Sequence, residues 1–201
     1  VCNYIIQGGN SEELLKKFDG AYSDGFDPDI HLKAIGVANQ TTMLRDETEE
    51  VQRRMRNAMI TRFGKEKIEE HFRYFDTICG ATQERQDALN DLLNRPMDLL
   101  LVVGGYNSSN TSHLAEMGEE KLPTYFIKDS KEMESNEKLH HFLQDKHEMV
   151  VAENWLPKDN ELTVGVTAGA SCPNNLIEEV ILRVYELRGI NKELLINSIR
   201  N

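Results

Sequence analysis

Apolar and polar positions follow one another along this chain in a recurring order: a short apolar run, a polar turn, and then a stretch of helical period. The apolar runs that open these repeats are residues 33–39, 74–78, 99–103 and 162–166. Runs of this length are typical of strands buried in a parallel sheet. The order of strand, turn and helix therefore predicts an α/β fold built on parallel sheets.

Helical periodicity and breaker residues divide the rest of the chain. Helices are expected at residues 11–18, 45–63, 65–72, 83–94, 112–120 and 174–188, and a further strand at 124–127. Ser11 is expected to cap the first of these helices. The charged segment 129–146 predicts a solvent-facing helix, which would expose His140 and His141. The closing helix is expected to bury Leu176, Ile177, Val180, Ile181 and Val184.

The stretch 99–111 carries the strongest local signal for a ligand. Its apolar run ends at Gly104 and Gly105, and five of the next six residues bear a small amide or hydroxyl group. A strand that ends in such a turn at a helix N-terminus surrounds one point with donors, which suits a phosphate or diphosphate. Asn and Ser are also ordinary cap and turn residues, so a purely structural role stays open.

Three further turns have similar chemistry. They contain Thr41, Cys79 and Ser171, and each follows one of the other apolar runs. In a parallel sheet such turns lie at the carboxyl ends of the strands, where ligands bind. The four turns would form one site if their strands share a sheet or if two sheets face each other, and a coincidence of caps is the alternative. None matches the glycine pattern of a dinucleotide fold or a Walker loop.

Composition narrows the possible partners. The chain has 201 residues, of which 39% are apolar, and its formal net charge of −11 disfavours nucleic acid and anionic membranes. No apolar run is long enough to span a bilayer. Three widely spaced cysteines without a CxxC motif indicate a reducing compartment. Cys79, at an expected helix N-terminus, should have a lowered pKa and suits a metal ligand or a nucleophile, although an inert thiol is the alternative.

Four motifs in this order resemble those of the LytB/IspH family, the 4-hydroxy-3-methylbut-2-enyl diphosphate reductases of isoprenoid biosynthesis. The motifs are Ala38–Thr42, Thr77–Gln86, Val102–Leu114 and Gly165–Ser171. Their residues are most similar to those of the plant and cyanobacterial branch of the family. The resemblance runs from about Val1 to Leu187. It implies three similar three-layer α/β units around a [4Fe–4S] cluster, of which this chain would hold about one and a half.

The resemblance also implies roles for particular residues. Cys79 would be the third cysteine ligand of the cluster, whereas Cys2 and Cys172 match no ligand position. The residues implied to bind the allylic diphosphate substrate are Thr41, Ser108, Ser109, Asn110 and Ser171. An electron donor such as ferredoxin or flavodoxin is implied as a partner, in the bacterial cytoplasm or the plastid stroma.

Other parts of the family's machinery have no counterpart here. The first two cluster cysteines, three substrate-contacting histidines and the proton-delivering glutamate are expected before Val1, so no catalytic residue is expected in this chain. The chain is therefore expected to be a C-terminal portion, with residues 1–76 in the second unit, 77–188 in the third and 189–201 as a tail. Alone it is expected to be inactive.

Two functions of other classes remain open on the sequence. One is a phosphate-ester-binding α/β enzyme without a redox cofactor, although no His or Glu stands out as a base at the turns. The other is a non-catalytic remnant, in which the turns only cap helices.

Overall fold

The computed structural model describes residues 1–157 and 161–190. It divides the chain into two compact units, Val1–Ile78 and a second that begins at Cys79, each with its own core. The assignment of these units to the second and third units of the family fold stays a prediction. Most of the expected tail, residues 191–201, lies outside the described residues.

The second unit is built on a parallel sheet with strand order β4-β3-β7. Its strands are β3 (Leu99–Val103), β4 (Thr124–Ile127) and β7 (Val164–Ala168). Val103 at the end of β3 lies opposite Ile127 on one side and Ala168 on the other, so the three strands end at one edge. Every residue of β3 is buried, which confirms the buried strand predicted from its apolar run.

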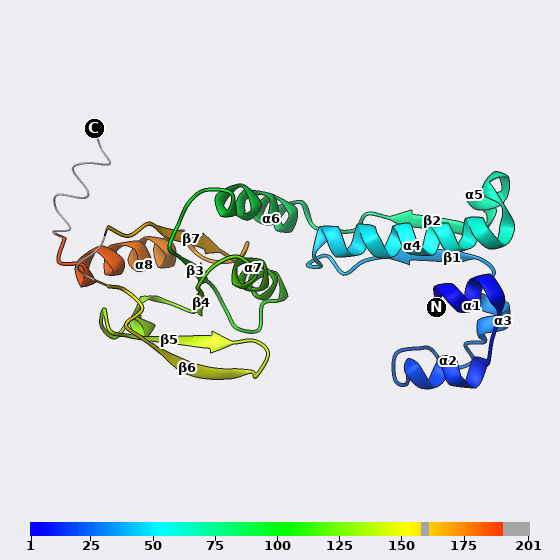
Figure 1. The fold of residues 1–201 in the computed structure, drawn as a ribbon, viewed down its shortest axis with the longest axis horizontal. Helices are drawn as coiled ribbons and strands as arrows, with labels where there is room; N and C mark the ends of the chain where they lie inside the picture. Colours follow the sequence, from blue (N-terminus) through cyan, green and yellow to red (C-terminus); the bar gives the residue numbers. More distant parts are fainter. Residues whose placement is uncertain (158–160, 191–201) are drawn as a thin grey trace. The chain divides into compact units, whose positions relative to one another are not determined.

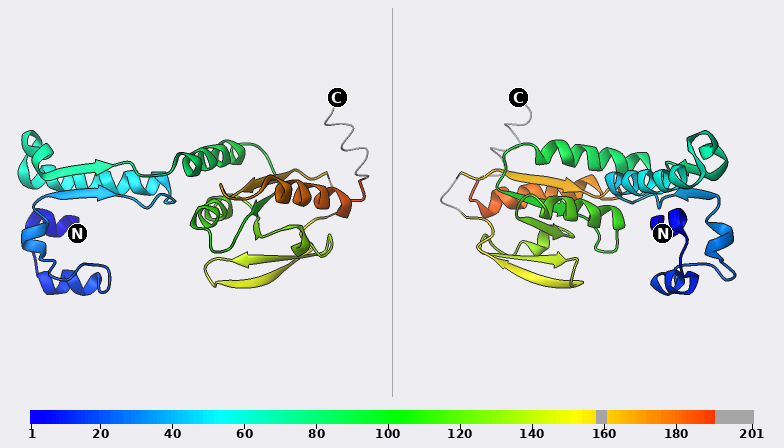
Figure 2. Two further views of the ribbon diagram at one scale, coloured as in Figure 1. Left: turned by 180° about the vertical axis from the view of Figure 1, so that it is seen from behind. Right: turned by 45° about the vertical axis from the view of Figure 1, so that its right-hand side comes forward.

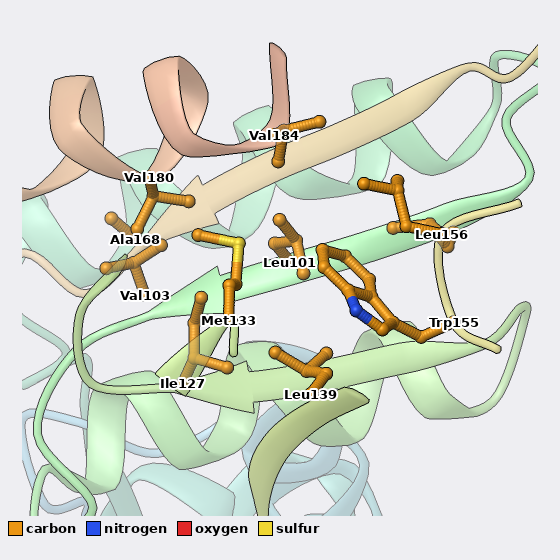
Figure 3. Packing of buried hydrophobic residues seen from close by; sticks show 11 residues of the cluster. Leu101, Val103, Ile127, Met133, Leu139, Trp155, Leu156, Ala168, Val180 and Val184 are labelled. Atoms are coloured by element: carbon orange, nitrogen blue, oxygen red, sulfur yellow. The ribbon is translucent and has the colours of Figure 1, made fainter. Parts of the chain in front are cut away.

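Alternate residues of β3 point to opposite faces of this sheet, as in any strand. Leu101 and Val103 belong to a cluster with Val180 and Val184 of α8 (Asn174–Leu187) and with Trp155 (Figure 3). Leu100 and Val102 belong to a second cluster. That cluster also contains Leu89 of α6 (Gly80–Leu93) and Leu114 and Ala115 of α7 (Ser109–Glu119). The predicted α/β class is confirmed, and this unit has helices on both faces of a parallel sheet.

The segment after β4 differs from the prediction. In place of one charged helix it forms a short turn, η2 (Ser130–Glu132), and an antiparallel hairpin of β5 (Lys138–Leu143) and β6 (Glu148–Glu153) (Figure 2). Leu139 and His141 are buried and their neighbours are more exposed, which is the period of a strand. Most charged residues of this segment lie in η2 and in the turns on either side of β5, and only Lys138 lies in the strand itself.

The first unit contains a two-stranded parallel sheet of β1 (Ile35–Ala38) and β2 (Phe72–Phe75), which run alongside the long helix α4 (Arg45–Phe63) (Figure 1). Its other elements are α1 (Cys2–Gln7), α2 (Ser11–Lys17), α3 (Pro28–His31), η1 (Lys65–Lys67) and α5 (Ile68–His71). The core joins Ile5 of α1, Met59 of α4 and Phe72 of β2.

Several local predictions need correction. β1 was expected to be buried, but Gly36 and Ala38 are exposed, and β2 begins two residues earlier than expected. The cap of α2 is Asn10 rather than Ser11, because its side-chain oxygen accepts hydrogen bonds from the backbone of the first turn. In α8 the expected burial holds for Val180 and Val184 and is only partial for Leu176, Ile177 and Ile181.

No helix within residues 1–157 and 161–190 is both long and apolar enough to cross a membrane.

Candidate functional site at the carboxyl edge of the second sheet

The turn after β3 leads directly into α7. The backbone N–H of Ser108 donates to the carbonyl of Gly105 at 3.0 Å, which closes a β-turn with Tyr106 and Asn107 at its centre. The helix begins at Ser109, three residues before the predicted start. Ser109 and Asn110 therefore lie in its first turn, where backbone N–H groups lack partners within the helix and favour an anion.

Ser108 is the N-cap of this helix. Its hydroxyl oxygen accepts hydrogen bonds from the Thr111 backbone N–H at 3.4 Å and from the Thr111 hydroxyl at 3.0 Å. The spacing of a serine and a threonine three residues apart is the sequence signal that could have found this cap. The Ser108 hydroxyl proton remains available to a ligand while its oxygen holds the helix start.

Asn110 is the most informative residue of the site. Its side chain is buried, with 5% of its surface exposed, and neither its amide nitrogen nor its amide oxygen has a hydrogen-bond partner. Leaving a buried polar group unsatisfied costs about 1–3 kcal/mol, so such groups normally have partners. An oxygen-rich ligand would satisfy the amide N–H groups.

The turn after β7 meets the same helix start. The N–H of Gly169 donates to the carbonyl of Val103 at 3.0 Å, and a β-turn from Gly169 to Cys172 places Ser171 at its centre. A Cβ atom on Gly169 would lie 2.1 Å from the Thr111 hydroxyl, and one on Gly104 would lie 2.8 Å from it. Only glycine fits at these two positions, and the turns after β3 and β7 therefore converge on Thr111.

The corresponding edge of the first unit holds Thr41. A β-turn from Gln40 to Met43 places Thr41 at its centre, exposed to solvent. The hydroxyl of Thr77 donates to the carbonyl of Asn39 at 2.6 Å and accepts from its N–H at 2.9 Å, which ties the ends of β1 and β2 together. The side-chain nitrogen of Asn39 is buried without a partner.

An open groove of about 740 Å³ lies beside this edge, between the first sheet and α4. Asn39, Asp76 and Ile78 line it together with polar residues of α4. The four predicted turns do not share a sheet, because β1 and β2 form one sheet and β3 and β7 form another. In the first unit Thr77 bonds Asn39, the residue before the Thr41 turn. In the second unit the turns of Ser108 and Ser171 converge on Thr111.

Cys79 is the N-cap of α6, which begins at Gly80, three residues before the predicted start, and its free thiol is exposed. Cys172 is a partly buried thiol whose pKa is raised by burial, and the Cys2 thiol contacts the sulfur of Met55. Within the described part of the chain, no three His, Cys, Asp or Glu side chains converge to hold a metal. The thiol of Cys79 fits one ligand position of an iron–sulfur cluster, and these residues do not hold a whole cluster.

The histidines need one correction. His141 was expected to face solvent but is buried, and its ring meets that of Tyr125 edge-on at 5.1 Å. Burial lowers the pKa of His141. His140 of β5 forms a hydrogen bond with Glu134, which precedes this strand, at 3.1 Å. His113 is a residue of α7, as expected.

Comparison with known proteins places the chain in context. The family model described as LytB protein matches residues 3–185. A 4-hydroxy-3-methylbut-2-enyl diphosphate reductase from Thermosynechococcus vestitus is 45% identical over 192 residues, which are 94% of this chain and 47% of that protein. One from Gloeobacter violaceus is 46% identical over 193 residues, or 96% and 46% of the two chains. This chain thus spans about half the length of the curated relatives it matches.

A solved structure supports the fold. The reductase described as E-1-hydroxy-2-methyl-but-2-enyl-4-diphosphate reductase from Plasmodium falciparum is 20% identical, with a TM-score of 0.51. The match covers 74% of this chain and 38% of that one. At this identity the likeness concerns the fold alone.

Proposed function

The chain belongs to the LytB family, and from this premise we propose that it is the C-terminal half of a 4-hydroxy-3-methylbut-2-enyl diphosphate reductase. The complete enzyme would remove the allylic hydroxyl of its substrate as water, with two electrons and protons, to give isopentenyl and dimethylallyl diphosphates. The coverage of about half of each relative supports the assignment to one part of the enzyme.

The observation that carries this proposal is the unpartnered amide of Asn110 at the start of α7. Its N–H groups, the N-terminal backbone of the helix and the Ser108 hydroxyl are neutral donors that suit a diphosphate without a lysine. Ser109 and Ser171, on the converging turns, would add donors from the exposed side. Fixing the diphosphate would fix the position of the allyl group relative to the reacting centre.

The other two predicted site residues would act nearer the reacting end. Thr41 would contact the substrate from the first unit. Cys79 would hold one iron of a [4Fe–4S] cluster, and the remaining two cysteine ligands would come from residues that this chain does not contain. When bound, the cluster supplies electrons and a Lewis acid to the allylic alcohol. A ferredoxin or flavodoxin would deliver the electrons, in the cytoplasm of a bacterium or the stroma of a plastid.

The proposal is tested by completing the enzyme with a relative. The 201 residues are fused behind the N-terminal half of the Thermosynechococcus vestitus reductase, the cluster is reconstituted, and turnover of the allylic diphosphate is measured with a chemical reductant. We expect iron–sulfur absorbance and turnover in the fusion, and neither in the 201 residues alone. Cys79→Ser should lose both, whereas Cys172→Ser is the matched control that keeps both.

Two results would contradict the proposal. One is reductase turnover by the 201 residues alone, because the proposal places the other cluster ligands outside them. The other is a Cys79→Ser fusion with the full absorbance and activity of the unmodified fusion, which would remove Cys79 from the cluster.

A further inference from the structure

Tyr106 occupies the centre of the β-turn that leads into the candidate diphosphate site, two residues before the cap Ser108. Its ring stacks on Phe142 of β5, with ring centres 4.7 Å apart and planes inclined by 18°. It meets Phe126 of β4 edge-on at 5.2 Å. The turn is therefore anchored through one aromatic side chain to β4 and to the hairpin.

The hydroxyl of Tyr106 donates a hydrogen bond to one carboxylate oxygen of Glu132, a residue of η2 that is 26 positions away. The other carboxylate oxygen accepts the backbone N–H of Lys128 at 2.7 Å. Burial raises the pKa of both Glu132 and Tyr106. Through these two hydrogen bonds the Glu132 carboxylate joins the turn after β3 to the segment after β4. The strands β3 and β4 end side by side.

A second contact from the hairpin reaches the helix itself. The side-chain amide of Gln144 donates to the backbone carbonyl of Ser112, in α7, at 2.6 Å. Three contacts thus hold the start of α7. Gly169 packs on Thr111 from the β7 side, Glu132 bonds Tyr106 from the β4 side, and Gln144 bonds Ser112 from the hairpin.

We propose that Tyr106 and Glu132 are positioning residues that hold the Gly105–Ser108 turn in its ligand-ready form. This inference rests on the proposed diphosphate site at α7. Neither side chain needs to touch the diphosphate, because both act through the turn that carries Ser108 and the residues after it. A turn fixed before binding loses less conformational entropy when the ligand arrives, so affinity rises without a new contact.

The pair offers variants that separate positioning from packing. Tyr106→Phe keeps the ring on Phe142 and removes only the hydroxyl. Glu132→Leu removes the acceptor, whereas Glu132→Gln can still accept from the Lys128 N–H and donate to the Tyr106 oxygen. Glu134→Leu is a matched control, since this nearby carboxylate bonds His140 and not the turn.

The test is calorimetric titration of the 201-residue chain with inorganic pyrophosphate. Tyr106→Phe and Glu132→Leu should each weaken binding about three- to tenfold, the effect of one net hydrogen bond. The double variant should bind no more weakly than Glu132→Leu alone, because that variant already lacks the hydrogen bond that Tyr106→Phe removes. Glu132→Gln should restore binding to within about twofold of the unmodified chain, and Glu134→Leu should leave it unchanged. Trp155 fluorescence confirms that each variant is folded.

The outcomes distinguish this inference from the proposed function. If Asn110→Ala abolishes binding while Tyr106→Phe and Glu132→Leu bind normally, the diphosphate site stands and the positioning role is overturned. Losses that multiply in the double variant would also overturn it. If pyrophosphate does not bind the unmodified chain, or binds Asn110→Ala equally well, the site and its positioning pair both fail.

Discussion

The two units of this chain have the same order of strand, turn and helix, but their strands are buried to different degrees. In each, parallel strands lead through hydroxyl-bearing turns toward helices. In the second unit no residue of β3 is more than 3% exposed, whereas in the first β2 ends in Tyr74 and Phe75, which are 55% and 60% exposed. Parallel sheets need cover on both faces. The second unit has that cover within its described residues, whereas the residues of the first unit do not cover Tyr74 and Phe75.

The two units also differ in one asparagine each, Asn110 and Asn39, whose side chains have buried atoms without hydrogen-bond partners. Asn110 in the second unit lacks partners for both its side-chain nitrogen and its side-chain oxygen, and it lies in the first turn of a helix whose start is held on three sides. Asn39 in the first unit lacks a partner for its nitrogen alone and is only half-buried. The turn that precedes Asn110 is fixed by contacts with β4, β7 and the hairpin, and these contacts come from the layers that surround the second sheet.

The largest expected effect is on the core of the second unit. Leu101→Ala removes a fully buried side chain from the central strand and should lower the free energy of unfolding by about 2–5 kcal/mol. Trp155, the single tryptophan of the chain, lies in the same cluster. Its fluorescence therefore reports the unfolding of the second unit in urea.

Met59→Ala is the matched change in the first unit, where Met59 is equally buried. It should leave the Trp155 transition in place, because its contacts belong to the other core. An equal shift of that transition by both variants would contradict the division of the chain into two separately stabilised units.

A smaller effect is expected from pH. Burial lowers the pKa of His141 in the folded chain, so the unfolded chain binds a proton more readily in the range from that lowered value up to about 6.5. The free energy of unfolding of the second unit should therefore fall as pH drops below about 6.5, and His141→Phe should flatten this dependence.

Urea unfolding followed by Trp155 fluorescence at several pH values measures the slope. Tyr125→Phe keeps the ring against His141 and does not titrate in this range, so it should keep the slope. A slope that survives His141→Phe unchanged would assign it to other groups.

The smallest effect is expected at the open sheet of the first unit. Phe75→Ala removes a ring that is mostly exposed, and it should change the free energy of unfolding by less than about 0.5 kcal/mol. Thermal unfolding monitored by circular dichroism checks this. A loss as large as that of Leu101→Ala would mean that Phe75 is covered in solution.

Local patterns predicted the elements whose surroundings they determine. The apolar run of β3 could only be a buried strand once two glycines ended it, and the periodicity of α4 gave both ends of that helix correctly. The helix predicted at residues 129–146 was wrong, because a segment with many charges resembles a solvent-exposed helix. Leu139 and His141 are buried by a partner strand and a core that the local pattern does not contain.

The sequence indicated four candidate turns, but it did not show which of them lie together. The turns of Ser108 and Ser171 do meet, whereas that of Thr41 belongs to a different sheet. The contact between Tyr106 and Glu132 was missed because it depends on where the misassigned segment returns to the sheet. Whether these side chains and Cys79 act as proposed stays a prediction.

Nuclear magnetic resonance can test whether the second unit binds a diphosphate at Asn110. The side-chain amide signals of Asn110 and Asn39 are followed as pyrophosphate is added to the ¹⁵N-labelled 201-residue chain, each assigned by its loss in the Asn→Ala variant. We expect a saturable shift of the Asn110 signal and a stationary Asn39 signal. An Asn110 signal that does not move at millimolar pyrophosphate, or a shift of Asn39 alone, would contradict it.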